Sequence, residues 1–179
     1  MAEQNWQKVE EWMELYADRI LRMVCLVVGN PHLAEEITQE VFIKAFENSA
    51  NFRSESAPYT WLYRIALNLS RNYLKRRHLL QFWPWGEEEN RLNVLEEPLE
   101  EQVTRREAGR KIRYCISRLP LHYREVIILY YYDDLKISDI AKVLEQPEGT
   151  VKSHLARGRE ALEKVMRKEG LTYAREGQI

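Results

Sequence analysis

The segment from Ser138 to Leu162, SDIAKVLEQPEGTVKSHLARGREAL, carries the side chains best suited to binding DNA. Its apolar residues recur at helical spacing on two sides of a short turn, and the small Ala141 lets the two helices approach closely. This pattern predicts a helix-turn-helix, in which the second helix enters the major groove. The side chains expected to point outward from that helix are Lys152, Ser153, Ala156, Arg157 and Arg159.

Each of these residue types has a suitable partner on DNA. Lys and Arg bind phosphates or the acceptor edge of guanine, Ser bonds to either, and Ala offers a methyl contact to thymine. His154 is expected to touch a phosphate or only to cover the surface. A helical pair with a purely structural role is the alternative interpretation.

A second set of candidate residues lies between Glu55 and Glu87, an interval that contains no acidic side chain. Four polar residues there follow i, i+4, i+7, i+11 spacing and therefore share one helix face, namely Arg64, Asn68, Arg71 and Lys75. Such a basic face predicts an attraction for nucleic acid, whereas a solvated helix surface is the plainer alternative.

Aromatic rings accompany that basic face. Phe52 and Arg53 lie in the preceding loop, and three more rings begin the helix, at Tyr59, Trp61 and Tyr63. Single-stranded nucleic acid binds such surfaces because bases stack on rings while cations follow the backbone. The alternative is that these rings belong to the core, which is the interpretation favoured for Trp61.

The third set is an acidic and amide patch formed by Glu35, Glu36, Gln39 and Glu40, with Phe42 and Phe46 further along the same helix. Such a patch is a solvated face or a docking surface for another protein.

Helices are the elements that must position these residues. Apolar stripes predict helices over 9–28, 31–48 and 59–77, with Gly29, Asn30 and Pro31 separating the first two. Further helices are expected from Pro98 to near Pro120, over 138–144 and over 147–168. Residues 121–133 are rich in Val, Ile and Tyr but lack strand alternation, so they are expected to form a buried helix. The predicted fold class is all-α.

Composition divides the chain into two small helical domains, 1–80 and 98–179. Between them, residues 81–97 lack helical periodicity, contain Pro84 and Gly86, and carry a net charge of -4, so they are expected to form a flexible acidic linker. The domains on either side carry net charges of 0 and +3.

Several classes of protein are disfavoured. No apolar stretch is long enough to cross a bilayer and no secretory signal precedes Lys8, so a cytoplasmic protein is expected. Cys25 and Cys115 lie apart in apolar surroundings, which favours core thiols. The histidines fall in separate segments, and neither a phosphate-binding Gly loop nor a nucleophile with a partner base is evident, so no enzymatic activity, metal or cofactor is expected.

Three segments, in order, resemble the extracytoplasmic-function group of bacterial RNA polymerase sigma factors: HLAEEITQEVFIKAF, FRSESAPYTWLYRIALNLSRNYLKRR and RLPLHYREVIILYYYDDLKISDIAKVLEQPEGTVKSHLARGREAL. The resemblance covers residues from about Tyr16 to Met166 apart from the linker. It implies an amino-terminal sigma region 2 that recognises and melts the promoter -10 element. It also implies a carboxyl-terminal region 4 that reads the -35 element.

The resemblance also implies roles for individual residues. Glu36, Gln39 and Glu40 align with the surface for the largest subunit of core RNA polymerase. The loop 51–58 corresponds to the one that captures a flipped base. The residues implied at the -10 element are Phe52, Arg53, Arg64, Asn68, Arg71 and Lys75. Those that align with the readers of the -35 element are Lys152, Ser153, His154 and Arg157, and the outward positions Ala156 and Arg159 complete the predicted -35 set.

Two departures from the family pattern bear on region 4. The family usually has Gly where this chain has Glu145, so a turn of different build is a possible outcome, and it often has Arg where His154 stands. No inhibitory extension or additional domain is evident, so restraint is expected from another molecule, for which the resemblance suggests an anti-sigma factor.

Rival interpretations make different demands on the chain. A stand-alone helix-turn-helix regulator binds duplex DNA without polymerase and does not need Glu36, Gln39 and Glu40. A helical adaptor would tolerate loss of Arg64 and Arg71.

Overall fold

The computed structural model of the chain describes residues 2–49, 52, 57–78 and 109–171. Within these ranges the secondary structure is helical, without a strand, which confirms the all-α prediction. The helices are α1 (Ala2–Val28), α2 (Pro31–Asn48), α3 (Pro58–His78), α5 (Leu121–Tyr131), α6 (Ile137–Leu144) and α7 (Glu148–Lys168). Residues 109–117 are also helical. The proposed linker and the first part of the helix expected from Pro98 lie outside the described residues.

The junction between α1 and α2 has the predicted chemistry. Gly29 adopts a positive φ of 71°, which a glycine tolerates without steric cost. Asn30 then caps α2, its side-chain oxygen accepting a hydrogen bond from the backbone N–H of Leu33 at 2.9 Å. Pro31 occupies the first turn, where its missing N–H costs nothing. The two helices are thereby held in a tight hairpin.

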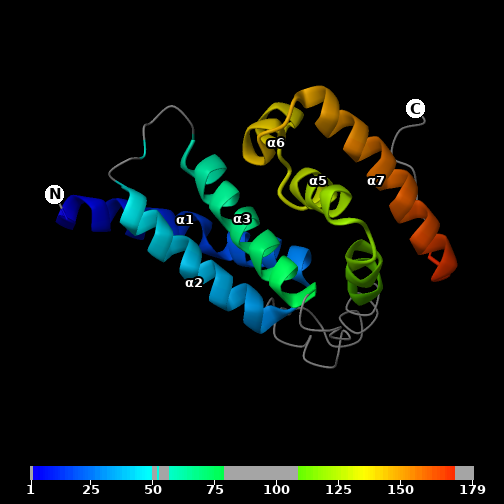
Figure 1. Cartoon of the computed structure of the whole chain (residues 1–179), viewed down its shortest axis with the longest axis horizontal. Coiled ribbons are helices and arrows are strands. Elements are labelled where there is room, and N and C mark those ends of the chain that lie inside the picture. Colours follow the sequence, from blue (N-terminus) through cyan, green and yellow to red (C-terminus); the bar gives the residue numbers. More distant parts are fainter. Residues whose placement is uncertain (1, 50–51, 53–56, 79–108, 172–179) are drawn as a thin grey trace, which may run out of the picture.

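The helices α1, α2 and α3 pack as one group. The predicted stripe of α1 is buried at Trp12, Ile20, Val24 and Val27. That helix extends seven residues further toward the amino terminus than the apolar stripe indicated, beginning at Ala2 rather than Val9. Figure 1 shows α2 and α3 lying beside it.

The second group consists of α5, α6, α7 and the helical residues 109–117. The prediction of a buried helix after Pro120 is confirmed, because Val126, Ile127, Ile128 and Leu129 are all buried in α5. Glycine allows α7 to approach α5 closely, since a Cβ added at Gly158 would lie 3.2 Å from Ile127 Cγ1.

The two groups of helices pack against each other. Helix α1 lies against α5, α3 lies against α6, and the buried apolar side chains form one continuous cluster. Arg124 joins them through its guanidinium, which donates to the carbonyl oxygen of Val27 at 2.7 Å and to those of Leu119 and Ser117. Desolvation lowers the pKa of Arg124. The sequence patterns carried no information about this packing.

Two further expectations concern the interior and the membrane. Cys25 and Cys115 are both buried, as expected for core thiols. Among the helices of the described residues, none combines the length and the apolar character that a membrane crossing requires.

Candidate nucleic-acid interface

The turn between α6 and α7 keeps the backbone form that a glycine would provide. Glu145 adopts the left-handed conformation, with φ 54° and ψ 44°, at the carboxyl end of α6. The N–H of Gln146 then bonds to the carbonyl of Ala141 at 3.0 Å, which closes the helix end. The expectation that Glu145 changes the build of the turn is therefore not met. The cost is local strain, on the order of 1 kcal/mol for a residue with a Cβ in this conformation.

Helix α7 is held against α6 by apolar contacts. Ile140 and Val143 of α6 are buried, as are Val151 and Leu155 of α7. The opposite side of α7 is left in solvent. The exposed side chains on it include Lys152, Ser153, Ala156 and Arg157, as the sequence predicted.

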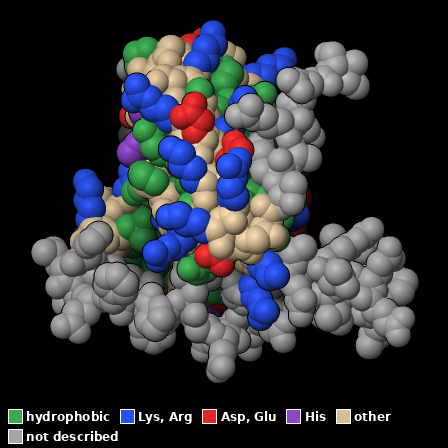
Figure 2. Space-filling view, turned by 90° about the vertical axis from the view of Figure 1, so that its right-hand side faces the viewer, with side chains coloured by type: hydrophobic (Ala, Val, Ile, Leu, Met, Phe, Trp, Pro, Cys, Tyr) green, Lys and Arg blue, Asp and Glu red, His purple; other side chains and the backbone are tan. Residues whose placement is uncertain are grey.

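That side of the molecule is rich in positive charge. Figure 2 faces the side of the protein where α7 lies and shows Lys and Arg side chains gathered in its middle, with few acidic ones between them. Lys152 Nζ lies 4.0 Å from Glu148 Oε2 of the preceding turn, and both side chains remain exposed. An exposed basic helix face with one Ser and one small apolar residue has the composition that major-groove binding requires.

Two residues predicted on this face lie differently. Arg159 is only partly exposed, because its guanidinium lies over the rings of Tyr130 and Tyr131, 5.6 and 5.8 Å from their centroids. Its outward placement from helical spacing alone was wrong, since the adjacent α5 offers aromatic partners.

His154 packs toward α5 as well. Its ring centroid lies 5.1 Å from that of His122 and 5.8 Å from that of Tyr123. Desolvation, together with the charges of His122 and Arg157, lowers its pKa. The imidazole is thus more a covering group at the edge of the face than a free cation.

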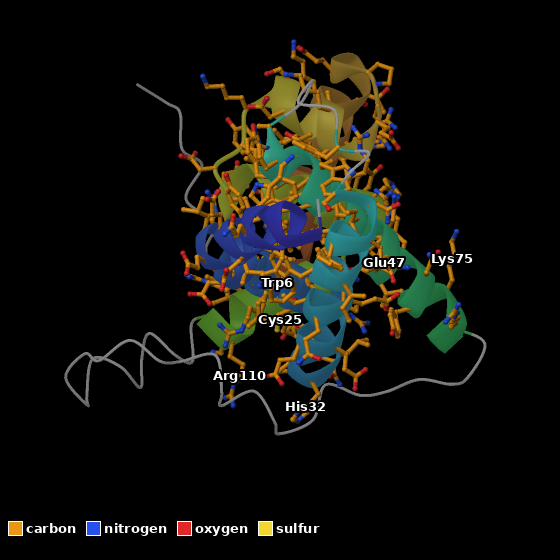
Figure 3. The ribbon with its side chains drawn as sticks, turned by 90° about the vertical axis from the view of Figure 1, so that its left-hand side faces the viewer. Trp6, Cys25, His32, Glu47, Lys75 and Arg110 are labelled. Carbon is orange, nitrogen blue, oxygen red and sulfur yellow. The ribbon has the colours of Figure 1, made fainter. Side chains whose placement is uncertain are left out.

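The basic face of α3 is split between solvent and the second group of helices. Asn68 and Lys75 are exposed, and Figure 3 shows Lys75 extending away from the carboxyl-terminal part of α3. Arg64 and Arg71 are only partly exposed. The i, i+4, i+7 spacing correctly placed these side chains on one side of α3 but gave no sign that this side meets α5 and α6.

Arg71 forms a bidentate ion pair with Glu125 of α5. Its Nε lies 2.7 Å from Glu125 Oε1 and its Nη2 lies 2.8 Å from Oε2. The Glu125 side chain is 4% exposed, against 28% for Arg71. Hydrogen bonding to Glu125 raises the pKa of Arg71, while burial opposes that rise. Two parallel charge-assisted bonds make this a strong and directional contact.

Arg64 binds the end of α6. Its Nη2 donates to the carbonyl oxygen of Lys142 at 2.7 Å, and its Nη1 lies 3.1 Å from Glu145 Oε1. The carbonyl is one of those left without a partner at a helix carboxyl terminus, where a cation also suits the helix dipole.

Tyr63 and Asp133 form a buried contact that the sequence did not reveal. The Tyr63 hydroxyl donates to Asp133 Oδ1 at 2.9 Å, and Arg19 Nη2 donates to the Asp133 carbonyl at 2.8 Å. Burial raises the pKa of Asp133 to about 6, an effect that Tyr63, Arg19 and Arg22 partly oppose. Tyr63 is therefore a core residue and not a stacking platform. No local sequence pattern could have predicted this contact, because it joins a tyrosine of α3 to an aspartate that follows α5.

The loop before α3 places one ring on the surface of an aromatic cluster. Phe52 lies 5.1 Å from Trp12 and 5.2 Å from Trp61 between ring centroids, and Lys8 Nζ lies 4.8 Å above the Phe52 ring. Trp61 packs on the core, as expected. Arg53 lies outside the described residues.

The acidic patch of α2 is accessible and has apolar neighbours. Glu36 and Gln39 are exposed, whereas Glu40 accepts a hydrogen bond from the Tyr73 hydroxyl at 3.2 Å. Ile43 and Phe46, further along α2, are exposed by 58% and 38%. Trp6 of α1 contacts Phe46 edge-on, 5.7 Å between centroids, and Figure 3 shows it on the face that α1 and α2 share. Exposed apolar side chains beside carboxylates suit a protein partner.

Within the described residues, no group of three or more His, Cys, Asp or Glu side chains is placed to hold a metal ion.

Comparison with known families identifies both halves of the chain. Residues 12–79 match sigma-70 region 2, and residues 109–162 match sigma-70, region 4. The aligned ranges contain the basic face of α3, the acidic patch of α2 and the helix-turn-helix.

Characterised relatives align over most of their length. The chain is 36% identical to the ECF RNA polymerase sigma factor SigW of Bacillus subtilis over 162 residues, which cover 87% of each chain. It is 35% identical to the RNA polymerase sigma-H factor of Pseudomonas aeruginosa, covering 84% of this chain and 82% of that one. It is 38% identical to the ECF RNA polymerase sigma-E factor of Escherichia coli K12, covering 72% and 71%.

Solved structures share the fold at lower identity. The sigma factor RpoE of Bartonella quintana, solved in complex with the anti-sigma factor NepR, superposes with a TM-score of 0.70 at 19% identity and covers 90% of this chain and 98% of that one. CnrH, solved in complex with the cytosolic domain of CnrY, gives a TM-score of 0.70 at 17% identity, with coverage of 94% and 93%.

Proposed function

Because the chain belongs to the extracytoplasmic-function sigma factors of the sigma-70 family, we propose a division of promoter recognition between its two groups of helices. Members of this family are transcription initiation factors and not enzymes. The protein binds core RNA polymerase, directs it to promoters through their -10 and -35 elements and initiates transcription. We assign residues 1–80 to the -10 function and to polymerase binding, 98–179 to the -35 function, and 81–97 to the connection between them.

The observation that carries this proposal is the exposed side of α7. Lys152, Ser153, Ala156 and Arg157 lie in solvent on the second helix of a helix-turn-helix whose turn is intact. These residues read the -35 element in the major groove, with Arg157 and Lys152 suited to guanine or phosphate. His154 and Arg159 flank them and are assigned to the edge of the contact.

The -10 element is assigned to the loop before α3 and to the basic face of that helix. Opening DNA costs about 1.4 kcal/mol per stacked step, and capture of an extruded base returns part of that energy. Phe52 offers a ring beside Lys8 for such a base. The cations and the amide that would follow the strand are Arg53, Arg64, Asn68, Arg71 and Lys75.

The α2 patch is assigned to core polymerase. Glu36, Gln39 and Glu40 supply charge and hydrogen-bond acceptors, and the exposed Ile43 and Phe46 supply apolar area. A stand-alone DNA-binding regulator would have no use for this combination.

Regulation by a second protein is part of the proposal. The solved structural neighbours include a sigma factor bound to an anti-sigma factor, and we propose that this chain has such a partner too. Its site of action would be the cytoplasm, where core polymerase and promoter DNA are found.

Reconstituted transcription tests the proposal. Purified core polymerase with this protein should initiate at promoters selected from the genome of its source, and core polymerase alone should not. A gel-shift assay on the same promoters should show binding only when core polymerase is present. Binding by the protein alone with equal affinity would instead identify a stand-alone regulator.

A further inference from the structure

Two histidines meet at the edge of the exposed side of α7. His154 of α7 follows Ser153, which lies in solvent, and its ring centroid lies 5.1 Å from that of His122 on α5. His122 is itself exposed in the first turn of α5, and its ring centroid lies 4.1 Å from that of Tyr123. The fold thus brings two imidazoles from separate segments of the sequence together, beside the residues assigned to the -35 element.

The surroundings of His154 oppose a positive charge in the absence of DNA. Burial lowers the pKa of His154, and the charges of His122 and Arg157 lower it further. Glu125 raises that pKa, but its carboxylate is already bound to Arg71 of α3. In addition, Nδ1 of His154 is buried and has no hydrogen-bond partner among the described residues. A proton on this ring is therefore costly in the free protein.

A DNA duplex reverses this balance. It carries one negative charge for about every 1.7 Å of its axis, so a helix in the major groove lies close to several phosphates. An opposite charge within about 4–6 Å of a titratable group favours the charged form of that group. Histidine is the side chain whose charge ordinarily changes between about pH 5 and 8. A phosphate beside the two imidazoles therefore favours the protonated ring that the free protein disfavours.

We propose that His122 and His154 together hold a phosphate of the -35 duplex and take up a proton as it binds. This adds His122, on the helix that precedes the helix-turn-helix, to the DNA-binding residues. The inference rests on the proposed function, because the phosphate belongs to the duplex assigned to α7. By linkage, promoter affinity rises as the pH falls, by at most about tenfold per pH unit for one proton.

Promoter binding at two pH values tests this proposal. Holoenzyme assembled from core polymerase and the full chain is titrated against a fluorescein-labelled promoter duplex at about pH 6 and pH 8, and fluorescence anisotropy gives the affinity. At the lower pH, the unmodified protein should bind about fivefold more tightly than the variant His122→Gln, His154→Gln. At the higher pH the two affinities should agree within about twofold, because Gln keeps a neutral hydrogen-bonding group.

The matched control is His32→Gln, which removes an exposed imidazole from α2 in the other group of helices. Its pH dependence should equal that of the unmodified protein. Asp133, whose pKa of about 6 lies in the same range, is intact in every variant, so the comparison cancels its effect. His154→Lys supplies a permanent cation, and it should bind at the higher pH as tightly as the unmodified protein binds at the lower one.

Nuclear magnetic resonance of the full chain without polymerase supplies an independent check. The Cε1 proton of His154 reports the titration of that ring, and His122→Gln should raise its midpoint by removing an opposing charge. An unchanged midpoint overturns the proposal. So does a doubly substituted protein whose promoter binding keeps the pH dependence of the His32→Gln control. Absence of promoter binding at both pH values overturns the proposed function as well, whereas normal binding without the histidine effect overturns this inference alone.

Discussion

Arg157 is the side chain on α7 whose contact with DNA can be tested most directly. It is exposed on the outer side of the helix-turn-helix, between the apolar contacts that hold α7 in place. We expect Arg157→Ala to cost about 1–3 kcal/mol at the preferred -35 sequence if the guanidinium reads a base. Footprinting by the polymerase holoenzyme on promoters varied at the -35 element measures this loss.

The matched control is Lys111→Ala, which removes one exposed positive charge outside α7. A uniform loss over all promoter sequences would assign Arg157 to a phosphate. Binding that stays equal to that of the control on every sequence would remove Arg157 from the interface.

Glu36 provides the cleaner test of the polymerase surface. Glu40 also bonds to Tyr73 and pairs with Lys44, so its replacement would disturb the packing of α2 on α3. Glu36 is exposed, and we expect Glu36→Lys to weaken core binding by about tenfold, equivalent to ~1.4 kcal/mol. Isothermal titration of core polymerase measures this, with Glu160→Lys on α7 as the control. Equal affinities for the two variants would contradict the assignment.

At the scale of single residues, the sequence predicted the helix face on which a side chain lies better than it predicted the partners that the side chain contacts. Helical spacing correctly predicted that Lys152 and Arg157 are exposed, because these residues face no neighbouring element. It did not predict that the Arg159 guanidinium lies over the rings of two tyrosines of α5. It could not foresee the partners of Arg64 and Arg71, since these depend on contacts between residues more than fifty positions apart.

At the scale of elements, apolar periodicity predicted the helices well because each helix buries one stripe. The first helix was predicted too short, since its opening turns lack such a stripe yet continue the helix. The close approach of α5 and α7 was not predicted. It depends on Gly158, whose missing side chain leaves room for Ile127 and Tyr123.

That approach gives a prediction about stability. Gly158→Leu should lower the free energy of unfolding by about 1–3 kcal/mol, because the new side chain must displace Ile127 or separate α5 from α7. Urea unfolding followed by circular dichroism measures the change. Ala156→Leu, two residues earlier on the exposed side of α7, is the control and should be nearly neutral. A Gly158→Leu protein as stable as this control would show that the contact can relax freely.

At the scale of the whole molecule, the two groups of helices form one packed body that composition divided into two domains. The family ranges 12–79 and 109–162 lie one in each group. Their packing combines one continuous cluster of buried apolar side chains with a few charged and polar side chains that meet across the boundary. Short-range sequence patterns do not encode such meetings.

The buried carboxyl of Asp133 makes this packing sensitive to pH. Burial raises its pKa to about 6, so the compact state favours the protonated form relative to a solvated Asp, whose pKa is 3.8. The resulting stabilisation is fully present below the solvated pKa and is lost as the pH rises through about 6. Tyr63 of α3 and Arg19 and Arg22 of α1 face the group and limit the effect.

We therefore expect Asp133→Asn to stabilise the protein at neutral pH, where the unmodified side chain carries a buried charge. The gain should be at most ~3 kcal/mol and should shrink toward pH 5. Urea unfolding at both pH values measures it. Asp134→Asn is the control, because Asp134 is exposed and its positive φ of 53° also tolerates Asn. An identical pH dependence in the two variants would contradict the role given to Asp133.

The hydrogen bond from Arg64 to the carbonyl of Lys142 has a consequence for α6 itself. This helix has only eight residues, and a guanidinium from α3 completes its last turn. Any separation of α3 from α6 would return that carbonyl to water and deprive the short helix of this outside support. The amides near its end, from Val143 to Gln146, should then exchange hydrogen for deuterium faster, so mass spectrometry of this peptide reports separation in a protein that carries no label.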